Sequence, residues 1–582
     1  MSLADRLHRL VPDLWTPLAR FPVPVAISAA LCVYGNIDVA IIAVDGFAPG
    51  NQIYLAGGVA FLAAGVAHYL AQSRRYPRAA EILLALLGAL AAGALAYWDA
   101  HLRSSHIFLF AGLLLLLMIA GFLRRDAKQG ALWLFNLRLG LAALLAIIVA
   151  LVAGGGVSAV LASLKFLFNA ELTWKAHEYV WVTAITLIGP LCGLSLAPAN
   201  FDEEMPQMGG RDTLLDRGVS VLVNYILVPL AVVYALILHA YAVKILIDGT
   251  LPKGQIALMV SIFAVGGTAT WLIAWPWRET GTVVLRLFMR YWFWFTIIPV
   301  ILLAVAIRER LATYGATPER YGVIVIAVWL AFVTFYLAMR HNRADMRVVL
   351  GSLAVLVLIG SAGPWGVNNV SIESQFARLV RYVQAEGLLT QEGRIVDQPV
   401  SLTSDSKKEI GEILWFLENM GALDKLKPLF AGHKDDPFSE AAAWNIRSRI
   451  REILALDDYT PPPVEPTQVR FVSTGTLTQE IKGAGRLIGP AYLRSAPIGT
   501  QQGDAMLRNA DRSLYITVEG RTWSTPSGPL LVRLREAATT HRREPLALEI
   551  DPTLTLVITE ARGALGEPPF FTSGAFWFIL TP

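Results

Sequence analysis

Long apolar runs dominate the first two thirds of the chain. About eleven stretches contain roughly 20 mainly apolar residues, the length that a helix needs to cross the hydrocarbon core of a bilayer. Polar residues gather between these stretches. The pattern therefore predicts a polytopic α-helical membrane domain over residues 1–370, with spans near 21–44, 52–72, 79–98, 105–123, 136–162, 177–197, 218–246, 254–275, 290–307, 320–339 and 346–367.

The pattern changes after Trp365. Apolar residues at helical spacing predict soluble helices near 371–387, 406–420 and 439–455. A Pro-rich run follows and is typical of a stiff linker. Apolar alternation then predicts a β-rich domain, with strand candidates at 469–472, 513–518, 530–534, 553–558 and 576–580. The predicted organisation is a membrane domain (1–370), a soluble α-helical segment (371–459), a linker (460–466) and a β-rich domain (467–582).

Composition supports a membrane protein. The 582 residues are 55% hydrophobic and 16% charged, and their mean hydropathy is +0.52. A soluble globular protein carries about 25% charged residues, so a soluble enzyme and a disordered chain are excluded. Residues 371–582 carry 23 basic and 26 acidic residues, and this balance argues against binding of nucleic acid, which needs a basic surface.

The distribution of Lys and Arg predicts the orientation of the spans. Basic residues concentrate in alternate loops, for example at Arg74, Arg75 and Arg78, and loops of this kind face the cytoplasm. The N-terminus is therefore placed in the cytoplasm. An odd number of spans then puts the C-terminal region in the periplasm of a bacterial inner-membrane protein, where it could bind a periplasmic protein. A miscount of one span would reverse this placement.

The sequence offers little conventional catalytic chemistry. Its two cysteines, Cys32 and Cys192, form no CxxC pair, and HExxH, GxSxG and P-loop patterns are missing. Such patterns provide zinc sites, acyl-transfer sites and phosphate sites. We therefore expect no metal and no cofactor, with the lipid bilayer as the main partner, and we favour a protein that is not an enzyme.

Polar and ionisable groups inside spans are costly and are candidates for functional sites. Asp38 could bind a proton or cation on an interior face, or it could lie where water reaches the outer end of the first span. Asn136 and Arg138 open the fifth span. Arg138 could pair with an acidic side chain or a lipid phosphate, or its side chain could extend to the cytoplasmic headgroups.

The seventh run is the richest in polar residues. Pro229 removes a backbone hydrogen bond and can kink the helix. Tyr234 and Tyr241 are seven residues apart and share a helix face. A polar, kinked helix suits a substrate path, but it also suits an aromatic anchor at the membrane interface. The candidate residues here are Asn224, Tyr225, Tyr234, Tyr241 and Lys244.

Several short motifs in this part of the chain resemble a known family. They are Asn136-x-Arg138-Leu139, Asn224-Tyr225-x3-Pro229-x4-Tyr234, Tyr241-x2-Lys244, Gly363-Pro364-Trp365, Ser374-Gln375-x2-Arg378-Leu379 and Gly387-Leu388-Leu389. Over about residues 130–430 the chain resembles the bacterial polytopic membrane proteins catalogued as domain of unknown function 4153. The resemblance implies a bacterial inner-membrane protein, and it implies no established activity or catalytic residue.

Three functions compete at this point. The polar groups in the spans favour a transporter-like or flippase-like protein with a path around the seventh span. The soluble C-terminal region favours an envelope scaffold or sensor that anchors a partner-binding module outside the cytoplasm. A membrane enzyme acting on lipid-linked substrates would need a polar cluster at one interface, for which Glu171, His177 and Glu178 are the candidates.

Overall fold

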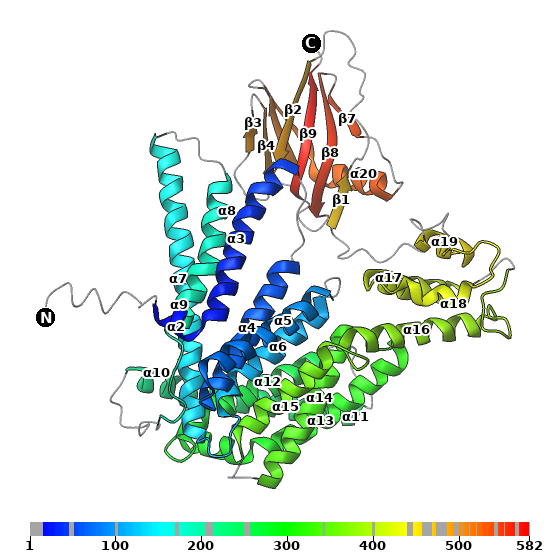
Figure 1. The fold of residues 1–582 in the computed structure, drawn as a ribbon. Coiled ribbons are helices and arrows are strands. Elements are labelled where there is room, and N and C mark those ends of the chain that lie inside the picture. Colours follow the sequence, from blue (N-terminus) through cyan, green and yellow to red (C-terminus); the bar gives the residue numbers. More distant parts are fainter. Residues whose placement is uncertain are drawn as a thin grey trace. The chain divides into compact units, whose positions relative to one another are not determined.

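The chain folds into two compact units in the computed structural model, Met1–Ala455 and Leu456–Pro582. Helices α2–α19 belong to the first unit, and the described residues of the second form strands β1–β9 and helix α20 (Figure 1). The predicted linker at 460–466 lies outside the described residues. The structure describes residues 15–45, 52–98, 103–168, 174–203, 214–248, 256–340, 344–397, 402–438, 446–456, 468–472, 486–493, 500–502, 505–510, 513–518, 521–539, 545–551, 553–564 and 570–580.

The first unit is built mainly from apolar helices. Within the described residues, ten helical segments are long and apolar enough to cross a membrane. Their elements are α3 (Pro22–Asp45), α4 (Gln52–Ser73), α5 (Arg78–Trp98), α6 (Arg103–Ile119) with η1 (Ala120–Phe122), α7 (Gln129–Phe168), α8 (Trp174–Thr183) with η2 (Ala184–Ile188) and α9 (Gly189–Ser195), α10 (Leu214–Leu222) with η3 (Val223–Leu227) and α11 (Val228–Asp248), α12 (Ile256–Ala274) with η4 (Trp275–Trp277), α13 (Val283–Tyr314) and α14 (Pro318–Arg340). A short helix, α2 (Trp15–Arg20), precedes them.

The eleventh predicted span corresponds to α15 (Met346–Ser361), which is apolar but has only 16 residues. At 1.5 Å per residue it is about 24 Å long, shorter than the roughly 30 Å of a bilayer core. The helix starts at a strong cap. Asp345 accepts a hydrogen bond from the Arg347 backbone, and Gln129 of α7 donates to its side chain at 2.6 Å. Burial alone would raise the pKa of Asp345, but these bonds and the Arg347 guanidinium lower it.

Two five-residue π-helical turns precede prolines in the spans. They are η2, before Pro190, and η3, before Pro229. Proline has no N–H to donate and its ring clashes with the carbonyl four residues earlier, so a wider turn relieves the clash while the helix continues. The sequence predicts a kink at Pro229. In the structure, the widened turn η3 lies just before this proline.

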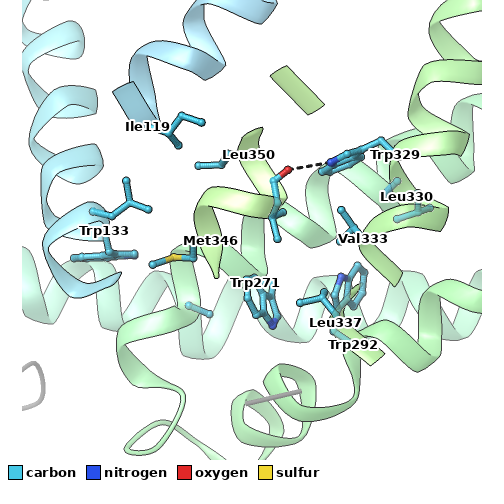
Figure 2. Close-up of a cluster of buried hydrophobic side chains, with 14 of the residues drawn as sticks. Ile119, Trp133, Trp271, Trp292, Trp329, Leu330, Val333, Leu337, Met346 and Leu350 are labelled. Atoms are coloured by element: carbon cyan, nitrogen blue, oxygen red, sulfur yellow. Dashed lines mark hydrogen bonds between the residues drawn. The ribbon is translucent and has the colours of Figure 1, made fainter. Parts of the chain in front are cut away.

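A large aromatic cluster forms the core of the membrane-spanning part. Trp271, Trp292 and Trp329 are buried there with aliphatic side chains from α14 and α15 (Figure 2). The indole N–H groups of Trp329 and Trp133 donate to backbone carbonyls. Trp329 donates to Val349 at 3.0 Å (Figure 2) and Trp133 donates to Ile273 at 3.2 Å. Trp329 and Trp133 thus supply apolar contact while their one donor is paired, whereas the buried Trp277 indole N–H has no hydrogen-bond partner among the described residues.

Helix α16 (Val367–Ala385) docks on the loop between α13 and α14 through one of the family-like motifs. Gln375 donates to the carbonyls of Tyr314 and Ala316 at 2.9 Å, and the Ser374 hydroxyl accepts from the Ala316 N–H at 2.8 Å. Gly315 lies between these residues with φ +67°, a backbone region that favours glycine. This motif therefore holds the loop in place.

The remaining helices of the first unit are soluble in character. They are α17 (Ser404–Asn419), η6 (Leu423–Leu426), α18 (Lys427–Phe430) and α19 (Ile446–Ile453). Helix α17 buries Ile410, Ile413, Leu414 and Leu417, and this spacing is the pattern from which the sequence predicts a helix. The part of the third predicted helix at 439–445 lies outside the described residues.

The second unit is β-rich, as the sequence predicts. One antiparallel sheet has the order β1-β8-β9-β2. Strand β7 belongs to the same sheet: β1 and β7 pair with one edge of β8, β1 near its C-terminal end and β7 near its N-terminal end. The other sheet has the order β3-β4-β5-β6. Both sheets and α20 contribute to one core. The strands are β1 (Gln468–Val472), β2 (Arg486–Leu493), β3 (Thr500–Gln502), β4 (Ala505–Ala510), β5 (Ser513–Val518), β6 (Arg521–Pro526), β7 (Leu546–Asp551), β8 (Leu554–Ala564) and β9 (Phe570–Leu580).

One predicted strand is wrong. Residues 530–534 lie in helix α20 (Ser527–Thr539). Leu530, Leu531 and Leu534 are all buried in the core of the second unit, and their spacing fits one face of a helix. Short apolar runs do not distinguish a strand from a buried helix. Pro529 lies in the first helical turn, where its missing N–H breaks no intrahelical hydrogen bond.

Candidate functional site

Asn224 and Tyr225, neighbours in the seventh span, point to different surroundings. Asn224 is buried, its amide donates to the Ser220 carbonyl at 2.9 Å, and its Oδ1 accepts from the Thr282 N–H at 2.9 Å. Thr282 caps the start of α13. Asn224 therefore connects the widened turn η3 to the N-terminus of α13. The Tyr225 side chain is 68% exposed and faces the outside of the helical unit.

Tyr234 and Tyr241 both pack against the aromatic core. The Tyr234 ring stacks on Phe263 with 6.2 Å between ring centroids, and its hydroxyl donates to the Met259 carbonyl at 3.4 Å. Lys244 is exposed. The shared face of the two tyrosines is thus a packing face, and none of the three residues lines the cavity described below.

Arg138 forms a bidentate ion pair with Glu203. The two N···O distances are 2.5 and 2.6 Å, and the side chains are 46% and 32% exposed. The sequence does not identify an acidic partner for Arg138. In the structure this partner is Glu203, from the segment after α9. An ion pair of this exposure contributes at most about 1 kcal/mol to stability.

A cavity of about 640 Å³ lies between α3, α4, α6, α7 and α9. This volume falls within the range of about 300–1,000 Å³ found for small-molecule sites. Its wall is almost entirely apolar. Small residues form one side of it, because α9 packs closely on α7: a Cβ at Gly189 or Gly193 would lie 3.1–3.2 Å from an alanine Cβ. The small lining residues include Gly140, Ala143, Ala146, Gly189 and Gly193.

Asn136 is a polar residue in this wall. Its amide donates to the carbonyls of Leu132 at 2.9 Å and Met118 at 3.1 Å. Its Oδ1 is buried, and no hydrogen bond reaches it from the described residues. Tyr69 is the other lining residue with a polar side-chain atom.

Asp38 lies on α3 and is 8% exposed. The Tyr54 hydroxyl on α4 donates to Asp38 Oδ2 at 3.3 Å, while Oδ1 receives no hydrogen bond from the described residues. The candidate residues are thus spread over several places. Asn136 lines the cavity, Asp38 belongs to a separate polar cluster, and the candidates of the seventh span take part in packing or face outward.

A buried ionic network that sequence reasoning missed lies where α4 meets α5. Glu81 accepts hydrogen bonds from His68 Nδ1 and Gln72 at 2.8 Å, and it pairs with Arg78 at 2.8 Å. His68 is fully buried, and Glu81 is 5% exposed. Arg20 of α2 donates to Gln72 and to the carbonyls of Ala197 and Pro198. The available signal was that polar residues Arg78 and Gln72 precede Glu81 by three and nine positions. Sequence spacing alone does not show that these side chains meet.

Among the described residues, His, Cys, Asp and Glu side chains are the candidates for metal binding. No group of three or more of these described side chains is close enough to hold an ion. Glu178 and His177 of α8 are described, and Glu171 lies outside the described residues.

Residues 39–380 match the family model described as "Domain of unknown function (DUF4153)". The chain belongs to this family. The match covers α4–α15 and most of α16, and it stops before the β-rich unit. It begins earlier and ends earlier than the resemblance over residues 130–430. Of the candidate residues, Asp38 alone lies outside the match, one residue before it starts.

A relative in Pasteurella multocida (strain Pm70) also carries no assigned function. This uncharacterised protein is 26% identical over 280 residues, which span 46% of the chain and 45% of the relative. The chain thus matches less than half the length of this relative. No solved structure matches the chain. The comparisons give a family without assigned activity, and the apolar helices of the described residues indicate a multi-pass membrane protein.

Proposed function

We propose that this family member is a transporter-like or flippase-like protein of the bacterial inner membrane that takes up a lipid-like amphiphile. The observation that carries the proposal is the apolar cavity between α3, α4, α6, α7 and α9. Its almost entirely apolar wall suits an acyl or isoprenoid chain. The proposal moves the substrate path from the seventh span to this cavity.

Gly140→Leu tests the proposal. A Cβ at Gly140 meets no atom within 4 Å, so the leucine extends into the cavity without disturbing the backbone. We expect the variant to retain its fold and to bind a photoactivatable phospholipid in liposomes about tenfold more weakly, a loss of ~1.4 kcal/mol. The measurement is the fraction of protein crosslinked, together with the rate at which a labelled phospholipid crosses the bilayer.

Gly156→Leu provides the matched control. Gly156 lies on the same helix, a Cβ there also meets nothing within 4 Å, and the residue does not line the cavity. Crosslinking and lipid movement should therefore equal those of the wild type. If wild-type protein neither crosslinks to the probe nor accelerates its movement, or if both glycine variants behave alike, the proposal is wrong.

The envelope scaffold or sensor is the second candidate function. It is favoured by the compact second unit, which has its own core of two sheets and a helix. The candidate requires the C-terminal region to face the periplasm, as the Lys and Arg distribution predicts when α15 crosses the membrane.

Reporter fusions at Pro582 of the full chain test this placement. Alkaline phosphatase is active only in the periplasm, and green fluorescent protein fluoresces when it folds in the cytoplasm. We expect an active phosphatase fusion and a dark fluorescent fusion. The reverse result would place the C-terminal region in the cytoplasm and remove the basis of the scaffold candidate, while leaving the lipid proposal untouched.

A further inference from the structure

Asp38 and two tyrosines form a polar cluster between α3 and α4. The Tyr54 hydroxyl reaches Asp38 Oδ2, and the Tyr34 ring packs edge-on against the Tyr54 ring with 5.5 Å between centroids. The Tyr34 hydroxyl and Asp38 Oδ1 are both buried, and neither has a hydrogen-bond partner among the described residues. Three oxygen-bearing side chains thus meet in an apolar helical unit with part of their bonding capacity unused.

The backbone is shaped to allow this meeting. Gly35 lies on α3 between Tyr34 and Asp38. A Cβ at this position would lie 3.0 Å from the Tyr54 hydroxyl and 2.7 Å from Val182 Cγ1. Any larger residue would push Tyr54 away from the carboxylate. The absence of a side chain at Gly35 therefore positions Tyr54 on Asp38.

Charge distinguishes Asp38 from the other buried carboxyl group. Glu81 is similarly buried, but it contacts Arg78, His68 and Gln72. Asp38 forms no ion pair with a described residue. Tyr34, Tyr54 and, beyond Tyr34, Tyr97 of α5 are the titratable groups described around it. An unpaired carboxylate in apolar surroundings is strongly disfavoured unless a cation neutralises it.

We propose that Asp38 and the hydroxyl oxygens of Tyr34 and Tyr54 form a binding site for a small monovalent cation, either a proton or a sodium ion. Carboxylate and hydroxyl oxygens are hard ligands that suit such ions. The site stands on its own contacts and does not depend on what the apolar cavity binds. If the protein transports its ligand, this is the site through which an ion gradient would act.

Dicyclohexylcarbodiimide provides the test, because it modifies protonated carboxyl groups in apolar surroundings. Full-length protein in liposomes is treated across a pH series, in choline buffer with and without sodium, and the modified peptides are identified by mass spectrometry. We expect modification at Asp38. If modification is lost as the pH rises and adding sodium has no effect, the bound ion is a proton. Loss on adding sodium at constant pH and ionic strength identifies sodium.

Three controls keep the test sharp. Glu81 should stay unmodified in the same sample, because it is ion-paired. Tyr54→Phe keeps the ring packing but removes one ligand oxygen, and it should shift the half-point in pH or sodium concentration by about tenfold. Tyr76→Phe removes an exposed hydroxyl and should shift nothing. The proposal is overturned if Asp38 is unmodified at every pH without sodium, or if the modified fraction of Asp38 depends on neither pH nor sodium.

Discussion

Glu81→Ala is expected to lower the free energy of unfolding by about 1–3 kcal/mol, the cost of leaving a buried hydrogen-bonding group without its partner. The carboxylate accepts from His68 and Gln72 and pairs with Arg78. Its removal leaves the His68 Nδ1–H, in a fully buried ring, without an acceptor. It also removes the acceptor of the Gln72 amide, although Gln72 still holds Arg20 through its own oxygen.

Reversible unfolding in mixed micelles measures this effect. Glu373→Ala is the matched control, because Glu373 pairs with Lys425 at the surface, where the two side chains are 60% and 40% exposed. Its cost should stay within about 1 kcal/mol. Equal costs for the two variants would show that the network around Glu81 is not a stabilising element of the fold.

Gly267→Ala should destabilise the aromatic core by about 3 kcal/mol, the upper part of the usual range for overpacking. A Cβ at Gly267 on α12 would overlap two ring atoms of Trp292. Trp292 cannot move aside easily, because it is 1% exposed and packs against Phe263 and Phe288 with centroid distances of 4.7 and 4.9 Å. In Figure 2, Leu337 lies beside the Trp292 ring.

The neighbouring residue supplies the control for this prediction. Gly266 lies on the same helix, and a Cβ there meets nothing within 4 Å. Gly266→Ala should therefore be neutral or should stabilise the helix by up to about 1 kcal/mol, the difference in helix propensity between the two residues. Thermal unfolding of both variants measures the contrast. If Gly267→Ala unfolds at the wild-type temperature, the close contact with Trp292 does not constrain the core.

Apolar run length predicted the spans of the first unit, but alternation predicted only β1, β5, β8 and β9 among the described strands and missed β2, β3, β4, β6 and β7. Each long apolar run became a helix, since a backbone in lipid must satisfy its own hydrogen bonds. The β-rich unit followed from alternation, with β5 (Ser513–Val518) matching its predicted bounds. The failure at 530–534 arose because a short leucine-rich run fits either period, and the choice depended on burying all three leucines in the shared core.

Sequence reasoning found the candidate residues without their environments. It singled out Asn224 and Tyr225 together, yet the first is buried in a hydrogen-bonded link and the second faces outward. It left the partner of Arg138 open, and the partner is Glu203, 65 residues away. Helical spacing places residues on a face, but the neighbour that covers that face comes from elsewhere in the chain.

The sequence by itself determined that this is a multi-pass helical membrane protein with a β-rich C-terminal region, and its motifs identified the family. Those properties depend on hydropathy and on the spacing of apolar residues, which can be read directly from the sequence. Tertiary structure alone decided the apolar cavity, the Glu81 network and the oxygen cluster at Asp38. Each of them joins separate helices, and Arg20 reaches carbonyls 177 and 178 residues away. Burial decides their chemistry, because a polar group acquires its energetic weight only when its neighbours exclude water.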